Sequence, residues 1–207
     1  MKLICSSSPW AAVVALVCWG SVLAAEAPGI DQAAAKIAVN ICSNCHGPGG
    51  HSTSPVFPRL AGQQELYLAA QIRAFKAKER GDPEAHDYMW GMATLLDDPM
   101  VAGLAKYFAE QAPAPGTPGD PALIEAGHKL FLEGDPEKGI LACAGCHGAD
   151  AQGNAIFPRL AGQHKAYLAR QIDVIQRQLR NSPIMHGVVQ NLQPDQIRAV
   201  TEYLSAQ

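Results

Sequence analysis

Apolar residues recur at helical spacing in four segments of the chain, two in each half. In each segment they stand three or four positions apart, which gathers them on one face of a helix with about 3.6 residues per turn. The four sets are Leu68, Ile72 and Phe75; Val101, Leu104, Tyr107 and Phe108; Leu168, Ile172, Ile175 and Leu179; and Ile197, Val200, Tyr203 and Leu204. The sequence shows no alternating strand pattern of useful length. The pattern therefore predicts an all-helical protein.

Residues 1–25 have the layout of an export signal rather than of folded structure. Lys2 gives a positive start, residues 10–19 form a short apolar run, and small residues stand at the end of the segment. The run is shorter than the roughly 20 apolar residues that a membrane-spanning helix needs, although an uncleaved anchor is the alternative. We predict cleavage near Ala24 or Ala25, export to the periplasm, and a mature chain without a membrane-spanning segment, for which peripheral association with a membrane stays open.

The chain after this segment contains two similar copies of one long motif. CSNCHGPGGHSTSPVFPRLAGQ begins at Cys42, and CAGCHGADAQGNAIFPRLAGQ begins at Cys143. Each copy is followed by two of the amphipathic segments, so the chain divides into two similar halves. The stretch 112–121 between them is rich in proline and glycine, which predicts a semi-rigid, solvated linker. We therefore predict an N-terminal domain over residues 26–111 and a C-terminal domain over residues 122–207.

Each copy of the motif opens with Cys-x-x-Cys-His followed by glycine, a residue that can end a helix with a positive φ angle. Residues three apart share one face of a helix, so both sulfurs can reach one flat ligand while the histidine turns toward its centre. This arrangement suits a haem attached through two thioether bonds with the histidine on its iron, although a redox-active disulfide or a Cys/His zinc site would use the same residue types. The residues are Cys42, Cys45, His46 and Gly47 in the first copy, and Cys143, Cys146, His147 and Gly148 in the second.

Alignment of the two closing segments identifies a methionine pair that could supply the sixth ligand of each iron. Matching Tyr107 with Tyr203 places Met89 opposite Met185, and a glycine stands two positions after each methionine. A thioether ligand closes the iron to substrates and raises its reduction potential relative to two histidines. Core packing is the alternative role of both methionines. Rival ligands are Met92, Met100, His86 and His186.

The paired CxxCH motifs, the FPRLAGQ blocks, the Met-x-Gly segments and the stretch GHKLF at residues 127–131 together resemble the dihaem cytochrome c4 family. The resemblance covers nearly all of the chain after the export signal. It implies an all-α fold of two tandem class I cytochrome c domains, each wrapped around one covalently attached haem. It also implies two haem c groups, thioether bonds at the four motif cysteines, and iron ligation by His46 with Met89 and by His147 with Met185.

The resemblance assigns further roles to residues around each haem. In class I cytochromes a proline carbonyl accepts the proton of the ligand histidine and fixes its ring, and Pro58 and Pro158 stand at that position. Gly127 and Phe131 resemble the crossing point at which the first helix of a domain approaches its last helix, here near Tyr203.

Four charged or titratable residues after the two CxxCH motifs have alternative roles. Arg59 and Arg159 come directly after the two prolines, and each either pairs with a haem propionate or is an exposed arginine. His164 and Lys165 are interpreted as part of a solvated face.

The first half departs from the family pattern at two places close to Met89. HSTSP at residues 51–55 replaces the acidic, glycine-rich loop that the second half keeps at residues 149–154, and the stretch 80–90 is longer than its counterpart. The surroundings of Met89 therefore differ from those of Met185. We expect the two haems to have unlike potentials.

Charge and composition narrow the class of function. The chain carries 16 Lys and Arg against 19 Asp and Glu, a formal net charge of −3, and it lacks the basic stripe that binds nucleic acid. We predict an electron carrier rather than an enzyme, which takes single electrons from a dehydrogenase or a quinol-oxidising complex and passes them to a terminal oxidase or reductase. The alternatives are a haem enzyme, such as a dihaem peroxidase or a thiosulfate-oxidising cytochrome, and the cytochrome subunit of a dehydrogenase complex.

Overall fold

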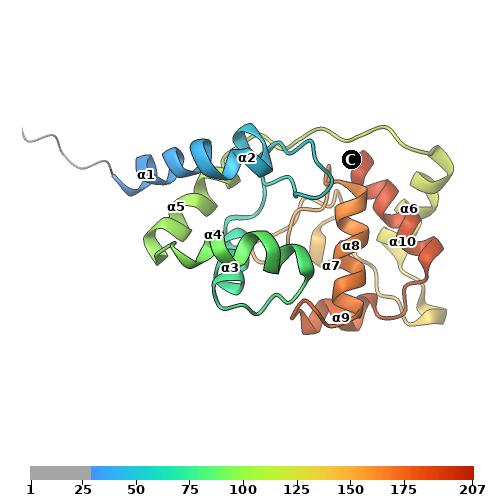
Figure 1. The fold of residues 1–207 in the computed structure, drawn as a ribbon. Helices are drawn as coiled ribbons and strands as arrows, with labels where there is room; N and C mark the ends of the chain where they lie inside the picture. Colours follow the sequence, from blue (N-terminus) through green and yellow to red (C-terminus); the bar gives the residue numbers. More distant parts are fainter. Residues whose placement is uncertain (1–28) are drawn as a thin grey trace, which may run out of the picture.

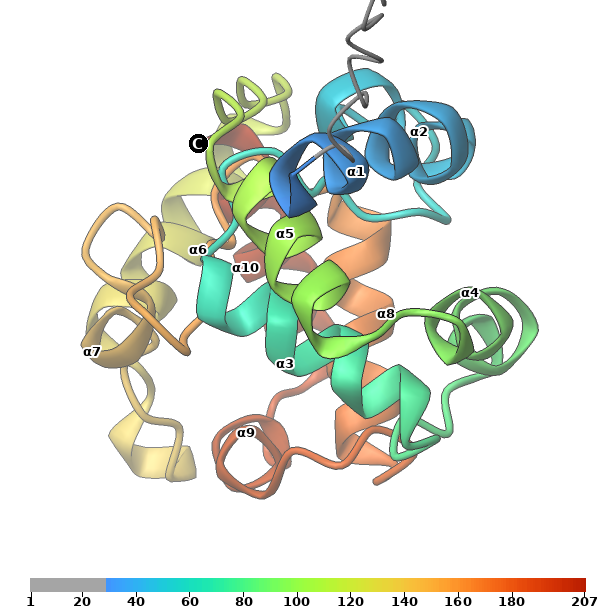
Figure 2. The same cartoon turned by 90° about the vertical axis from the view of Figure 1, so that its left-hand side faces the viewer.

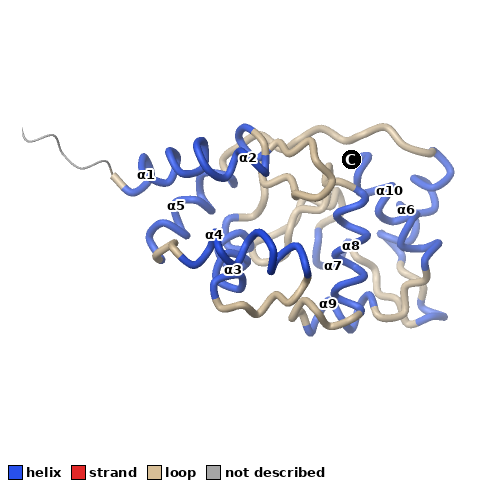
Figure 3. Tube along the Cα trace, in the orientation of Figure 1, coloured by secondary structure: helices blue, strands red, loops and turns tan. Residues whose placement is uncertain are grey.

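The computed structural model describes residues 29–207, so the predicted export signal lies outside the described part of the chain. Within that part, all regular structure is helical, and strand-like pairing is limited to isolated bridges (Figure 3). The prediction of an all-helical protein is confirmed. Among these residues, no helix combines the length and the apolar character needed to cross a bilayer.

The first half starts with a helix that runs through a π-helical turn into the first CxxCH motif (Figure 1). Seen from the side of the first half, α1 lies above α3 (Figure 2). The elements are α1 (Ile30–Ile37), η1 (Ala38–Cys42, π-helical), α2 (Ser43–His46), η2 (Pro48–Gly50), α3 (Glu65–Lys76), η3 (Ala85–Met89, π-helical), α4 (Trp90–Thr94) and α5 (Asp98–Ala109).

The second half repeats this order with fewer interruptions. Its first helix begins where the Asp120 side chain accepts hydrogen bonds from the backbone N–H groups of Ala122 and Leu123, with proline at the first helical position. Such a cap satisfies donors that have no partner inside the helix. The elements are α6 (Pro121–Glu133), η4 (Pro136–Lys138), α7 (Ala144–His147), α8 (Lys165–Gln176), α9 (Pro183–Val189) and α10 (Pro194–Ala206).

In each half a small residue lets the first helix cross the last at close range. A Cβ atom added to Gly127 on α6 would collide with the carbonyl oxygen of Ala199 on α10. In the first half the glycine is on the last helix instead, since a Cβ atom on Gly103 of α5 would lie 2.7 Å from the Cβ of Ala34 on α1. The expected crossing point in the second half is therefore present.

Each half has its own hydrophobic core. One cluster of buried residues runs from Ala34 to Phe108 and the other from Leu130 to Leu204, with no residue in common. This separation supports the predicted division into two domains, each built around the two amphipathic helices that follow its haem motif.

The linker 112–121 lies along the second half rather than standing free (Figure 1). The backbone N–H of Thr117 donates to the carbonyl of Ser205 at 2.7 Å, and the backbone N–H of Asp120 donates to the carboxylate of Glu202 at 3.2 Å. Most linker residues are exposed, as predicted for a solvated segment, but these bonds to α10 fix its path.

Candidate haem sites and the interface between them

Both CxxCH motifs end a helical turn at the histidine. Helix α2 ends at His46 and α7 ends at His147. The next residues, Gly47 and Gly148, have φ angles of 76° and 80°, a conformation that favours glycine. The structure thus contains the helix end that the motif predicts, with the chain turning away directly after each histidine.

One nitrogen of each motif histidine is held by a proline carbonyl. His46 Nδ1 lies 2.9 Å from the Pro58 oxygen, and His147 Nδ1 lies 2.9 Å from the Pro158 oxygen. Because the carbonyl can only accept, Nδ1 carries the proton and Nε2 is left with a lone pair. The two histidines are only 7% and 4% exposed, and burial lowers the pKa of both, an effect that the proline carbonyls oppose. The lowered pKa favours the neutral form of both rings at neutral pH, and this is the form that binds a metal.

His147 Nε2 is buried and has no hydrogen-bond partner. Buried polar atoms normally have a partner, so an orphaned nitrogen next to a CxxC pair points to a missing ligand. A haem iron bound at Nε2, with the ring fixed through Nδ1, would satisfy it. The residues of this site fit a haem.

The four motif cysteines are free thiols in the structure. Burial raises the pKa of Cys42 and raises that of Cys143 to about 11, whereas a redox-active CxxC pair needs a lowered thiol pKa. Within residues 29–207, no group of three or more histidine, cysteine, aspartate or glutamate side chains is placed to hold a metal ion. Haem attachment is the alternative that the geometry favours.

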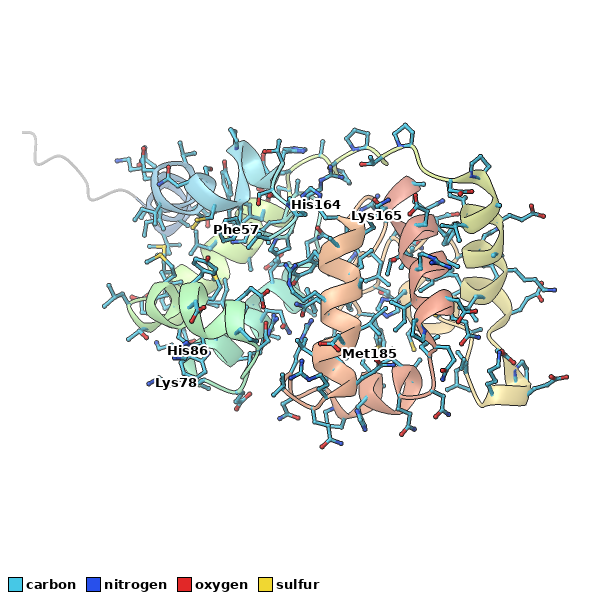
Figure 4. The ribbon with its side chains drawn as sticks, turned by 45° about the vertical axis from the view of Figure 1, so that its right-hand side comes forward. Phe57, Lys78, His86, His164, Lys165 and Met185 are labelled. Carbon is cyan, nitrogen blue, oxygen red and sulfur yellow. The ribbon has the colours of Figure 1, made fainter. Side chains whose placement is uncertain are left out.

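The candidate methionines differ in their surroundings. Met185 lies on α9 and packs against the core of the second half (Figure 4). Met89 is the last residue of η3 and is half-buried. Of the rivals in the first half, Met92 is 55% exposed, and Met100 lies on α5 and packs against the core.

The rival histidines already have other partners. His86 Nδ1 lies 2.7 Å from a carboxylate oxygen of Asp87 on the surface. His186 Nδ1 lies 3.0 Å from the Ile175 carbonyl, and its Nε2 lies 3.0 Å from the Gln178 side chain. Neither ring leaves a nitrogen orphaned in the manner of His147.

A phenylalanine ring lies beside each motif histidine. Phe57 meets the His46 ring edge-on at a centroid distance of 6.1 Å and the Tyr88 ring at 5.2 Å. Phe157 meets the His147 ring at 6.5 Å. In the first half, Phe57 therefore connects the motif histidine to the segment that ends at Met89.

The comparisons with known proteins decide the family. A family model described as cytochrome c matches residues 124–207. The chain is 38% identical over 205 residues to cytochrome c4 of Azotobacter vinelandii, an alignment that covers 94% of this chain and 97% of the relative. This chain belongs to the cytochrome c4 family. It is a dihaem c-type electron carrier with two cytochrome c domains and two covalently bound haem c groups.

Further relatives agree with this assignment. The solved structure of Acidithiobacillus ferrooxidans cytochrome c4 superposes with a TM-score of 0.77 at 36% identity, covering 80% of this chain and 98% of that one. A protein of Thiomonas intermedia (strain K12) named thiosulfate dehydrogenase electron acceptor is 38% identical over 173 residues, covering 80% of this chain and 78% of the relative.

The FPRLAGQ blocks of this cytochrome meet each other across the domain interface. Gln63 Oε1 accepts from the backbone N–H of Arg159 at 2.7 Å, and Gln63 Nε2 donates to the Arg159 carbonyl at 2.9 Å. Gln163 makes the same two contacts with the backbone of Arg59, both at 2.9 Å. The repeat is therefore also an interface motif, in which each block ends with the residue that binds the backbone of the other block.

A second set of paired residues lies at the interface between α3 and α8. Arg80 and Arg180 form an antiparallel bridge, and each guanidinium donates to both Gln71 and Gln171. Asp82 accepts two hydrogen bonds from Arg80 and is 1% exposed. Buried charges are normally paired and hydrogen-bonded, and this cluster meets that requirement by drawing on both domains.

The sequence interpretation of the residues after the two prolines needs one correction. His164 is not part of a solvated face, because its Nε2 donates to the Ser52 carbonyl of the other domain at 2.9 Å (Figure 4). Its counterpart Gln64 donates to the Gln152 carbonyl at 3.0 Å. Lys165 is exposed as predicted, and its ammonium pairs with Glu202 at 3.0 Å.

Arg59 and Arg159 are half-buried at the interface rather than exposed. Arg59 donates to the carbonyls of Ser52, Pro115 and Gly162, whereas Arg159 Nε is buried without a hydrogen-bond partner. Sequence reasoning singled out Arg59 and Arg159 but missed the other interface residues, although these also recur at a spacing of one hundred residues: Gln63 and Gln163, Gln71 and Gln171, and Arg80 and Arg180.

Proposed function

We propose that this cytochrome carries single electrons in the periplasm, from a dehydrogenase or a quinol-oxidising complex to a terminal oxidase or reductase. The observation that carries the proposal is the orphaned, buried Nε2 of His147, whose ring is oriented by the Pro158 carbonyl. A histidine held in this way suits a permanent iron ligand. The export signal predicted for residues 1–25 supports the compartment, and the family supports carriage.

The proposal includes a ligand set for each iron. His46 with Met89 would hold the first iron, and His147 with Met185 the second, while the cysteines of each motif would hold the porphyrin edge. When bound, haem c supplies a reversible one-electron centre. The protein orients each histidine through a proline carbonyl, and the methionine thioether closes the remaining side against water and substrates.

The arginines after the two prolines have a proposed role in holding haem propionates. Arg159 Nε is buried with no partner in the protein, so a carboxylate placed against it would satisfy a donor that is otherwise costly to bury. Arg59 uses Nε and Nη1 on carbonyl oxygens, which leaves Nη2 for the same contact.

A dehydrogenase is the donor that the relatives support most directly. The name of the Thiomonas intermedia relative describes an electron acceptor of thiosulfate dehydrogenase, which makes that relative a carrier downstream of an enzyme. Purified oxidised protein mixed with such a dehydrogenase and thiosulfate should be reduced at both haems. It should stay oxidised with thiosulfate alone.

An electron carrier and a haem enzyme differ in whether a small molecule can bind to the iron. If both irons have two protein ligands, the reduced protein will not take up carbon monoxide, and the oxidised protein will show the near-infrared band of methionine-bound iron at two equivalents per chain. Rapid carbon monoxide binding at either haem, or oxidation of thiosulfate without another enzyme, would contradict the carrier proposal and favour a haem enzyme.

A further inference from the structure

Arg170 breaks the symmetry between the two domains. It lies on α8 in the second half, and its counterpart one hundred residues earlier, on α3, is Ala70. The flanking residues are the same, since both helices contain the sequence Tyr-Leu-Ala followed by this position and then Gln-Ile. Arg170 therefore contacts the first domain, whereas Ala70 cannot make the equivalent contacts with the second domain.

The side chain of Arg170 reaches two separate segments of the first domain. Its Nη2 donates to the carbonyls of Pro55 at 3.2 Å and Val56 at 2.8 Å. Its Nε lies 3.0 Å from Glu84 Oε1 but makes no hydrogen bond of good geometry, so this contact is an ion pair. The guanidinium also lies 5.7 Å from the centre of the Tyr167 ring, which restricts its orientation.

The loop that Arg170 holds lacks the closure of its counterpart. In the second domain, Asn154 and Phe157 exchange two backbone hydrogen bonds, at 2.9 and 2.8 Å. In the first domain the Ser54 N–H bonds instead to the Ser52 side chain, and only the Phe57 N–H reaches back, at 3.2 Å. The first loop thus has one backbone bond between these positions where the second loop has two, and Arg170 adds two bonds to it from the other domain.

Both segments held by Arg170 lead directly to the first haem site. Val56 is followed by Phe57, whose ring touches the His46 and Tyr88 rings, and then by Pro58, whose carbonyl holds His46. Glu84 directly precedes η3, which ends at Met89. One side chain of the second domain therefore contacts the segment whose proline carbonyl orients His46 and the segment that leads to Met89.

We propose that Arg170 is a positioning residue through which the second domain fixes the loop that orients His46 and the segment that carries Met89. The inference rests on the proposed ligation by His46 and Met89. Loss of Arg170 frees the carbonyls of the loop and leaves Glu84 without its cation, so the segment ending at Met89 opens more often. The second haem receives no equivalent arginine contact from the first domain, because position 70 is alanine.

The test compares Arg170→Ala with the wild-type dihaem protein in two measurements. In the reduced state, proton NMR shows the methyl signals of iron-bound methionines far upfield, and Met89→Ala and Met185→Ala assign one signal to each haem. In the oxidised state, the rate of cyanide binding at each haem reports how often the methionine leaves the iron. We expect Arg170→Ala to raise that rate about tenfold at the first haem, which corresponds to about 1.4 kcal/mol, and to leave the second haem within twofold.

Two further variants separate contact from charge. Arg177→Ala removes a positive charge from the end of the same helix, where the guanidinium pairs only with Asp173 in its own domain, and should leave both rates unchanged. Arg170→Lys keeps the charge near Glu84 without the planar fork, and should restore part of the wild-type rate.

The failures of the two proposals are distinguishable. If Arg170→Ala keeps both haems and both cyanide rates within twofold of wild type, or accelerates both haems equally, the positioning role is wrong. If Met89→Ala leaves both upfield methyl signals in place, the ligand assignment is wrong instead.

Discussion

The reciprocal glutamine contacts predict how firmly the two domains are joined. In Gln63→Ala, the N–H and the carbonyl of Arg159 lose their partners at 2.7 and 2.9 Å, and the N–H of Gln64 loses a third contact at 3.0 Å. Gln63 is 7% exposed, so water reaches these groups poorly. The interface should weaken while each haem site stays intact.

The size of the effect follows from the groups left unpaired. A buried donor or acceptor without a partner costs about 1–3 kcal/mol. Two such groups on a half-buried arginine backbone therefore predict a loss of about 2–4 kcal/mol in the free energy of unfolding. Gln163→Ala should cost a similar amount, because Gln163 makes the equivalent pair of bonds to Arg59.

The assay is urea unfolding of the dihaem protein followed by circular dichroism and by the haem absorption. The control is Gln64→Ala, which removes one contact, to the Gln152 carbonyl, from a more exposed position, and should cost less than about 1 kcal/mol. A loss below about 0.5 kcal/mol in Gln63→Ala, with both haems bound, would refute the view that these bonds hold the domains together.

Three further substitutions test the haem sites, the helix crossing and the pH response. Met185→Ala should open one iron, lower its reduction potential and admit carbon monoxide at one haem per chain, as measured by potentiometry and by optical titration; an unchanged spectrum would exclude Met185 as a ligand. Gly127→Ala should destabilise the second domain by at least about 3 kcal/mol in thermal or urea unfolding, because the new methyl group meets the carbonyl of Ala199, and normal stability would contradict the close crossing. Burial and the nearby charge of Arg59 lower the pKa of His164, so protonation favours the unfolded state, and stability should fall as the pH drops below about 6.5, the unfolded value. His164→Gln should reduce this slope below about pH 6.5 in unfolding titrations, and an equal slope in both proteins would show that His164 is not its source.

Local patterns were sufficient to predict the helices and the haem motifs. The spacing of apolar residues located α3, α5, α8 and α10, and the glycine after each CxxCH motif gave the observed helix ends at His46 and His147. These features depend on residues close together in the sequence. The π-helical turns η1 and η3 were not predicted, because neither lies in one of the four amphipathic segments.

The contacts between the domains could not be predicted from these local patterns. His164 has the appearance of a solvated residue at the start of an amphipathic helix, and only the fold brings the Ser52 carbonyl to its ring. Gln63 and Gln163 were visible as repeated letters, but one polar residue can be repeated for many reasons. Their role depends on an approximate twofold relation between the blocks, which sequence spacing does not encode.

The central claim is that both copies of the repeated motif carry a covalently bound haem. Intact mass spectrometry of the exported protein, after denaturation and treatment with iodoacetamide, tests it most directly. The account predicts a single species with the mass of the chain without its export signal plus two haem groups, and no alkylated thiol among Cys42, Cys45, Cys143 and Cys146. A species with one haem or none, or with any of these four cysteines alkylated, would contradict it.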